Sequence, residues 1–176
     1  MRCLKIFIAI LILASGAFLA YIYSGVANVA ATSSDSIVAR WVLGTLRERS
    51  IATHISNIQV PSLTDPKMID DGFMHYQEDC ADCHLAPGIE TSGLRAGLNP
   101  RPPVLARTVP HSTPAELFWI TKNGIKMTAM PAWGQTHDDA TLWAIVAFLE
   151  KLPSITPTEY QVMKQAIKQS GSDSNK

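Results

Sequence analysis

The chain has 176 residues, 47% of them hydrophobic, and its 15 Lys and Arg residues balance its 15 Asp and Glu residues to a net charge of zero. This length predicts one domain with additional segments, large enough to bury a core. The neutral balance lacks the basic excess that is typical of nucleic-acid binders, so we expect no nucleic-acid partner. Only three cysteines are present, which excludes a disulfide-rich framework.

Residues 1–34 predict a membrane segment. Arg2 and Lys5 precede an apolar run from Ile6 to Tyr23. As a helix this run is about 27 Å long, close to the roughly 30 Å hydrocarbon core of a bilayer. Because the basic flank lies only on its N-terminal side, the positive-inside rule keeps the N-terminus in the cytoplasm. We therefore expect a single-pass protein of the bacterial cytoplasmic membrane, with the rest of the chain on the periplasmic side.

A cleaved signal peptide is the alternative interpretation of this segment, with Val29-Ala30-Ala31 as the cleavage site. The apolar run is longer than the roughly 7–15 residues of a secretory signal, which favours a retained anchor. Both interpretations export everything that follows.

Residues 35–63 form a connecting region in which a helix is predicted. Apolar residues recur there at helical spacing: Ile37, Val38, Trp41, Val42 and Leu46. Such a helix either packs on its own domain or offers a docking surface to a partner, and the pattern leaves both interpretations open.

The compact domain is predicted over residues 64–169. Residues that favour helix starts mark four helices. Three have caps: Asp65 before Pro66, Thr113 with Glu116, and Thr156 with Glu159. The start of the other is marked by Asp138 and Asp139, whose carboxylates complement the helix dipole. Gly124 and Pro153 are expected to end the second and third of these helices in chain order. The polar stretch 170–176 is predicted to be a disordered tail.

The predicted fold class is all-α, because no stretch shows the sustained alternation of a β-strand. Long loops rich in Gly and Pro are expected at 85–112 and 125–136. Loops of this length in a small domain are usually functional, and here they are long enough to wrap around a ligand.

The motif that indicates chemistry is Cys-Ala-Asp-Cys-His at residues 80–84, the C-x-x-C-H signal for attachment of a c-type haem. Cys80 and Cys83 lie on one helical turn, from which their thiols can form thioethers with two vinyl groups of a porphyrin. His84 then faces the iron as an axial ligand. The sequence therefore predicts one covalently bound haem c.

Three other interpretations of this motif are weaker. A zinc site needs four protein ligands, and only three cluster here. A thiol-redox C-x-x-C is expected near a βαβ pattern, which the sequence lacks. A structural disulfide leaves His84 unexplained.

Residues 66–153 resemble the class I c-type cytochromes. The similar stretches are, in chain order, Gly72-Phe73-x-x-Tyr76 before Cys-Ala-Asp-Cys-His, the segment Asn123–Trp133, and Leu142-Trp143-x-x-x-x-Phe148-Leu149. In that family they are the first helix with the haem motif, the sixth-ligand loop and the last helix. The resemblance implies a helical domain that wraps the haem and in which the first and last helices cross closely at a glycine. Gly72, packed against Trp143 or its neighbours, is the candidate.

The resemblance also implies a sixth ligand from a methionine directly before a proline, which selects Met130 ahead of Met127. A thioether opposite a histidine raises the haem potential relative to two histidines. His111 and His137 are interpreted as surface or loop histidines. The predicted metal ligands are therefore His84 and Met130.

Further haem-contacting residues follow from the same resemblance. A proline after the haem motif supplies the carbonyl that accepts the second ring N–H of His84, and Pro102 or Pro103 is the equivalent, with Pro103 as our choice. Tyr76 belongs to the family's motif before the haem cysteines, and Trp133 resembles its tryptophan near a haem propionate.

Three arginines, Arg95, Arg101 and Arg107, lie between the haem motif and the second predicted helix. An arginine can pair with a haem propionate, and we take Arg101 as the candidate. The alternative is that all three are ordinary solvated side chains.

An iron closed by two protein ligands predicts an electron carrier rather than an enzyme, because O₂ or peroxide chemistry needs a vacant position. The expected partners are membrane-associated redox proteins: a quinol-oxidising complex, a dehydrogenase or a terminal oxidase. Two alternatives stay open. One is a fixed cytochrome subunit of a membrane oxidase or dehydrogenase complex, and the other is a haem-based sensor, which requires Met130 to leave the iron.

Overall fold

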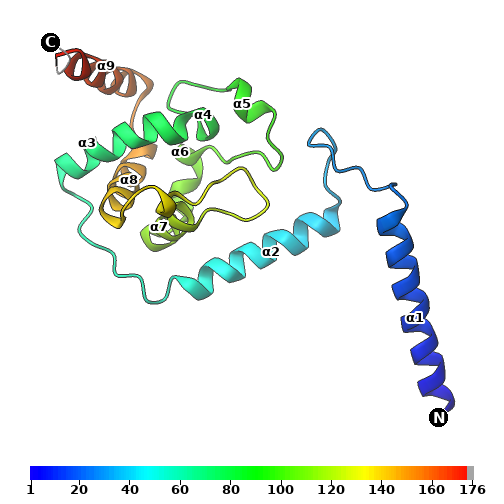
Figure 1. Cartoon of the computed structure of the whole chain (residues 1–176). Coiled ribbons are helices and arrows are strands. Elements are labelled where there is room, and N and C mark those ends of the chain that lie inside the picture. Colours follow the sequence, from blue (N-terminus) through cyan, green and yellow to red (C-terminus); the bar gives the residue numbers. More distant parts are fainter. Residues whose placement is uncertain (174–176) are drawn as a thin grey trace. The chain divides into compact units, whose positions relative to one another are not determined.

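The computed structural model describes residues 1–173, and all regular structure in this part of the chain is helical, as predicted (Figure 1). The α-helices are α1 (Arg2–Tyr23), α2 (Ile37–His54), α3 (Pro66–His75), α4 (Ala81–His84), α5 (Gly93–Ala96), α6 (Leu105–Thr108), α7 (Pro114–Asn123), α8 (Asp139–Lys151) and α9 (Pro157–Asp173). A π-helical turn, Tyr76–Cys80, joins α3 to α4, and 3₁₀ turns lie at Val109–His111, Trp133–Gln135 and Leu152–Ser154. The chain divides into two compact units, Met1–Ser34 and the part from Asp35 onward.

The first unit is built around α1, which has 22 residues, none of them buried. A helix of this length extends about 33 Å, and by length and composition it is able to cross a membrane. It ends at Tyr23, and the hydroxyl of the next residue, Ser24, donates to the Tyr21 carbonyl at 2.7 Å.

The second unit begins with α2, whose start is capped by the Ser36 side chain accepting from Ala39 N at 3.0 Å. The predicted helix of the connecting region is therefore present. Only its C-terminal end is anchored: Ile51 is buried, and the His54 ring lies 5.6 Å from that of Trp119 in α7. The apolar side chains of its first half are exposed, among them Ile37 at 77% and Trp41 at 69%.

The core of the domain is the crossing of α3 and α8 (Figure 1). Gly72 lies at the crossing, where a β-carbon would overlap the Ala144 backbone carbonyl and come within 3.0 Å of Phe148 Cβ. The prediction that Gly72 packs against Trp143 or its neighbours is confirmed by this contact. Glycine is required because the neighbouring atoms belong to a rigid helix backbone.

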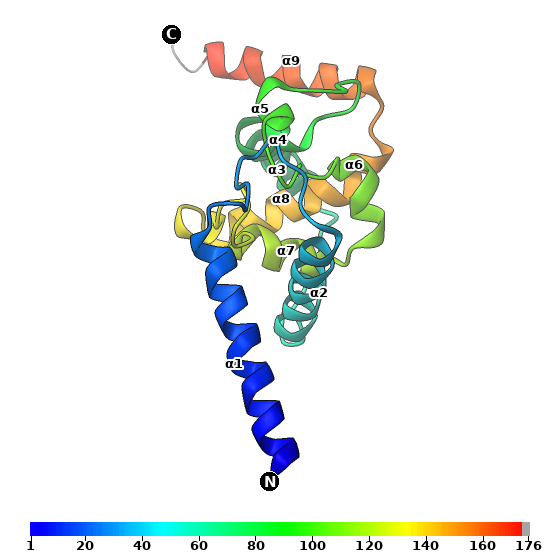
Figure 2. The same cartoon turned by 90° about the vertical axis from the view of Figure 1, so that its right-hand side faces the viewer.

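An aromatic cluster fills the space between α3, α8 and α9. Phe73 lies with its ring centroid 5.3 Å from Phe148 and 5.2 Å from Tyr160, and Tyr76 lies 5.1 Å from Phe148. Tyr76, Phe148 and Tyr160 are fully buried. The last helix is thus part of the core at its N-terminal end, and Figure 2 shows it at the opposite end of this unit from α2.

Side-chain caps fix the starts of the helices at the predicted positions. Asp65 accepts from Lys67 N at 3.0 Å, and Asp138 accepts from Thr141 N at 2.8 Å. The Thr113–Glu116 and Thr156–Glu159 pairs both form the reciprocal bonds of a capping box. The predicted helix starts are confirmed, because a cap depends only on residues two or three positions apart.

The ends of the helices agree with the turn residues of the sequence, with one difference. α7 ends at Asn123 before Gly124, and α8 ends at Lys151, two residues before Pro153. α9 continues to Asp173, beyond Ser170, where we expected the tail to begin. Residues 174–176 of that tail lie outside the described residues.

Candidate functional site

The Cys-Ala-Asp-Cys-His sequence, residues 80–84, forms the end of a helical run that begins at Pro66; we call these residues the attachment turn. Cys80 is buried with 7% of its surface exposed, whereas Cys83 and His84 are partly exposed. Both cysteines are free of disulfide bonds. The two thiols and the imidazole are therefore presented by one turn, with the side chains of Cys83 and His84 at its accessible side.

A π-helical turn sets the register of this segment relative to α3. The N–H of Ala81 donates to the carbonyl of Tyr76, five residues earlier, instead of the four of an α-helix. The wider turn shifts the attachment turn relative to the face of α3 that packs on α8. Single π turns inside helices occur frequently at functional sites.

The chain leaves the attachment turn through a strained residue. Leu85 has φ of +65° and ψ of 175°, a conformation that costs a non-glycine residue about 1–3 kcal/mol. It is held there by burial, with 3% of its surface exposed, and by the Tyr76 hydroxyl, which donates to the Leu85 carbonyl. Tyr76 thus supports the turn that directly follows His84.

The imidazole of His84 is oriented by a backbone carbonyl. Its Nδ1 lies 2.9 Å from the Pro103 oxygen, so Nδ1 donates and Nε2 keeps a free lone pair. Burial lowers the pKa of His84 and the nearby Arg95 lowers it further, against the hydrogen bond to Pro103, which raises it. The neutral imidazole that results is the form that ligates a metal.

The two prolines considered from the sequence have different partners. The carbonyl of Pro103 accepts from His84, whereas the carbonyl of Pro102 accepts from Nε of Arg95 at 3.1 Å. The hydrogen bond that the resemblance implies is therefore present, and it is made by Pro103.

The thiols of the attachment turn are neutral. Burial raises the pKa of the Cys80 thiol to about 12. Burial also raises the pKa of Cys83, with a further contribution from the Asp82 carboxylate.

The other segment with predicted site residues lies between α7 and α8, and its residues 124–133 are here called the methionine loop. The loop closes on itself through Ile125 N–H, which donates to the Met130 carbonyl at 3.2 Å. Thr128 Oγ donates to Ile125 O at 2.7 Å and accepts from Met130 N at 3.1 Å. These bonds fix the backbone of Met130.

The two methionines of this loop differ in exposure. Met130 is half-buried, whereas Met127 has 82% of its surface exposed and a φ of +60°. Trp133 is half-buried in the 3₁₀ turn that follows. The environment of Met130 suits a ligand inside a protein better than that of Met127.

Gly124 allows the loop to fold back on itself. Its φ is +65°, and a β-carbon there would lie 2.6 Å from the carbonyl carbon of Pro131. The glycine that ends α7 therefore also brings the Met130–Pro131 backbone close to that helix.

The donor set fits a haem of the c type. Two thiols and an imidazole with a free Nε2 come from one turn, and a thioether is available from the methionine loop. Residues 67–149, which contain both segments, match the family model described as cytochrome c oxidase, cbb3-type, subunit III. The chain contains a class I c-type cytochrome domain. A comparison of the chain with curated proteins finds no match.

A cytochrome c domain implies haem c binding and electron transfer with redox partners. Of the other predicted site residues, Tyr76 is buried and its hydroxyl donates to the Leu85 carbonyl. In the structure it therefore supports the backbone directly after His84. Arg101 is exposed, whereas Arg95 is partly buried and near enough to His84 to lower its pKa. The sequence could not predict which arginine lies nearest to His84, because positions along the chain do not show which side chains meet in the fold.

A cavity of about 480 Å³ lies between α2 and the methionine loop of the cytochrome. It is lined from one side by Leu43 and Arg47 and from the other by Trp119, Ile125 and Met127. None of its lining residues belongs to the attachment turn. Along this stretch α2 is therefore separated from the loop, in agreement with the exposure of its apolar residues.

The structure also brings together His75, Asp79 and His137, which sequence reasoning did not connect. The spacing of His75 and Asp79, four residues apart in a helix, was a visible signal. The approach of His137 could not be read from the sequence, because it depends on how the methionine loop returns to α3.

Proposed function

We propose that this cytochrome carries single electrons through one haem c that is bound covalently by Cys80 and Cys83 and ligated by His84 and Met130. The observation that supports it most directly is the 2.9 Å hydrogen bond between His84 Nδ1 and Pro103 O, which leaves Nε2 as the nitrogen for the iron. When bound, the haem supplies a one-electron couple between ferrous and ferric iron. The protein supplies both axial ligands and so leaves no position for an exogenous substrate.

Met130 is the proposed sixth ligand because its backbone is fixed by two hydrogen bonds and its side chain is half-buried. A thioether ligand stabilises ferrous iron relative to a second imidazole and raises the potential. Pro103 and Trp133 are proposed to line the haem, and Arg95, in addition to Arg101, is a candidate to pair with a propionate.

We further propose that α1 anchors the cytochrome in the bacterial cytoplasmic membrane with the haem domain on the periplasmic side. The support is the length and apolar composition of α1 together with Arg2 and Lys5 at its N-terminal end. An anchored carrier meets partners that lie in the same membrane: a quinol-oxidising complex, a dehydrogenase or a terminal oxidase.

The test is the visible spectrum of the purified holoprotein, recorded oxidised, reduced, and reduced with carbon monoxide. We expect the weak far-red methionine-to-iron band in the oxidised protein and no change with carbon monoxide. Met130→Ala should lose the band and bind carbon monoxide, whereas the matched control Met127→Ala should behave as wild type. A wild-type protein without the band, or one that binds carbon monoxide at once, would overturn the proposal in favour of a sensor.

A second candidate function is a fixed subunit of a membrane oxidase or dehydrogenase complex. Two observations favour it: the matching family model is described as an oxidase subunit, and the first half of α2 exposes apolar side chains that the described domain does not cover. Mild detergent extraction discriminates the two functions. A subunit should purify with stoichiometric partner chains, and an Ile37→Ser/Trp41→Ser variant should lose them. A free carrier should purify alone.

A further inference from the structure

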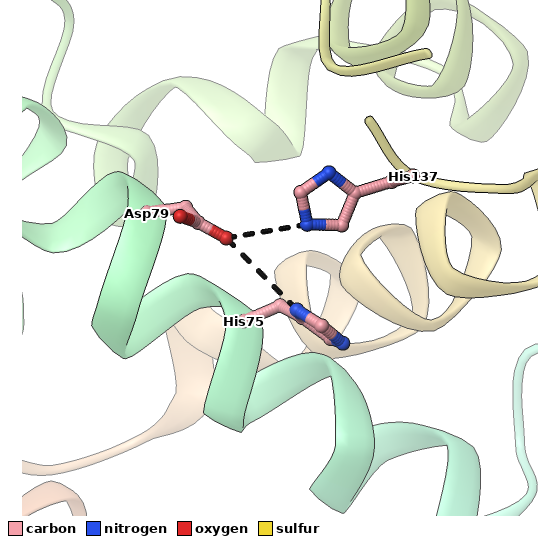
Figure 3. Close-up of side chains that lie close together, drawn as sticks. All are labelled: His75, Asp79 and His137. Carbon is pink, nitrogen blue, oxygen red and sulfur yellow. Dashed lines mark ion pairs between the residues drawn. The ribbon is translucent and has the colours of Figure 1, made fainter. Parts of the chain in front are cut away.

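We propose that His75, Asp79 and His137 form a second metal site, distinct from the haem site, that takes a divalent transition-metal ion such as Zn²⁺. One ligand atom from each residue lies within 4.8 Å of the other two. His75 ends α3, Asp79 lies in the π-helical turn, and His137 precedes α8. Figure 3 shows one oxygen of Asp79 facing a ring nitrogen of each histidine.

The distances are those of ligands around an ion rather than of direct hydrogen bonds. Asp79 Oδ2 lies 3.5 Å from His137 Nε2 and 3.9 Å from His75 Nδ1. Both distances exceed the roughly 2.7–3.2 Å of a hydrogen bond. With zinc–ligand bonds of about 2.0–2.2 Å, two ligands of a tetrahedral ion are roughly 3.3–3.5 Å apart. The Asp79–His137 pair already has that spacing, and the Asp79–His75 pair is a few tenths of an ångström longer. The three ligand atoms lie within 4.8 Å of one another, so binding of an ion would draw them together.

A hydrogen-bond chain is compatible with the tautomer of His137 that ligates a metal through Nε2. The Thr136 hydroxyl lies 3.3 Å from the Trp133 carbonyl, to which it can donate, and 2.9 Å from His137 Nδ1, from which its oxygen can then accept. In that arrangement the proton is on Nδ1, and Nε2 has a lone pair on the side of the Asp79 carboxylate. A lone pair and a carboxylate oxygen facing each other at 3.5 Å are stabilised by a cation between them.

A second carboxylate lies next to the cluster in the chain. Asp138 follows His137 directly and accepts from Thr141 N at 2.8 Å at the start of α8. Two carboxylates, Asp79 and Asp138, thus accompany two imidazoles. The three ligand side chains are between 16% and 33% exposed, so an ion and its water can reach them from solvent.

Two imidazoles and one carboxylate are ligands for zinc, copper and nickel rather than for magnesium or calcium, which prefer oxygen alone. Three protein ligands leave a further coordination position for water or for a partner's side chain. The site joins the helical run that carries the attachment turn, through His75 and Asp79, to the segment after the methionine loop, through His137. The His137 ring lies 5.3 Å from that of Trp133, the last residue of that loop. A bound ion would therefore connect the two segments that carry the proposed haem ligands.

The test is calorimetric titration of Zn²⁺ into the full-length ferric holoprotein in detergent after treatment with a chelator. We expect one ion per chain and at least tenfold weaker binding in His75→Ala, His137→Ala and Asp79→Asn. His111→Ala and Cys3→Ser are matched controls, because both residues are exposed and lie outside the cluster, and they should bind as wild type.

A second measurement separates loss of the site from loss of the fold. Zn²⁺ should raise the melting temperature of wild type and of both controls, and should leave that of the near-isosteric Asp79→Asn variant unchanged, while the haem spectrum stays the same. The absence of stoichiometric binding by wild type, or binding that persists in all three ligand variants, would overturn the proposal. A direct salt bridge between protonated histidines and Asp79 would then account for the cluster.

Discussion

The attachment turn and the methionine loop carry the proposed axial ligands, yet they are built differently. The attachment turn continues a helix, and its first residue, Cys80, is buried against the aromatic core. The methionine loop lies largely outside the helices and is fixed by a few local hydrogen bonds, with Met127 exposed between them.

The difference predicts that the two proposed axial ligands are not equally secure. His84 is held by a helix, by the Pro103 carbonyl and by two neighbouring cysteines that can bond covalently to the haem. Met130 is held by hydrogen bonds within its own loop, to Ile125 and Thr128. We therefore expect substitutions in the attachment turn to affect retention of the haem. Substitutions in the methionine loop should affect the sixth coordination position of the iron.

The largest effect is expected from Cys80→Ser/Cys83→Ser. Without the two thiols no thioether can form, so haem should be lost completely on denaturation. Met130→Ala is the comparison variant and should keep its haem through the same treatment. Haem staining of a denaturing gel measures both. Retention of haem by the double serine variant would contradict the assignment of the two cysteines.

A smaller but still large effect is expected from Gly72→Ala. The added β-carbon overlaps the Ala144 carbonyl, which belongs to a helix backbone and cannot rotate away, so the free energy of unfolding should fall by about 3 kcal/mol. Gly44→Ala in α2 is the matched control, because its β-carbon meets no atom within 4 Å. It should be neutral or stabilising by up to about 1 kcal/mol through helix propensity.

Denaturant unfolding followed by circular dichroism measures both glycine variants. Equal stability of Gly72→Ala and wild type would contradict the close crossing of α3 and α8.

Gly124→Ala tests the loop and should have a local effect. Its φ of +65° costs an alanine about 1–2 kcal/mol, and the β-carbon also meets Pro131. We expect partial loss of the methionine-to-iron band and slow binding of carbon monoxide, with the haem still attached. Gly93→Ala, which has open space around its β-carbon, is the control for this spectrum. An unchanged spectrum in Gly124→Ala would show that the loop is as secure as the attachment turn.

The smallest effect on stability is expected from Glu159. Its capping box with Thr156 starts the helix whose Tyr160 packs on Phe73. Hydrogen bonds from Thr156 lower the pKa of Glu159 below its ordinary value of 4.5. Its ionised form therefore contributes stability that is present above pH 4.5 and is lost as the pH falls through the lower pKa of the folded state.

Thermal melts of wild type and Glu159→Gln from neutral to acidic pH measure this contribution. The difference in melting temperature should be small near neutral pH and should disappear in acid. A difference that does not change with pH would contradict the proposed role of the carboxylate.

The sequence by itself determined the features that depend on near neighbours in the chain. The caps at Asp65, Thr113, Asp138 and Thr156 involve residues two or three positions apart, and all four are present in the structure. The attachment turn is likewise a local motif, since its two cysteines and its histidine lie on a single turn. Even the requirement for Gly72 followed from a family pattern within one short helix.

Only the tertiary structure decided the features that join distant segments. It selected Pro103 over Pro102 for His84, brought Arg95 near the imidazole while leaving Arg101 exposed, and left most of α2 uncovered. It also brought His137 to His75 and Asp79. The physical reason is that local hydrogen bonds specify where a helix begins, whereas the meeting of residues tens of positions apart depends on how all the helices pack.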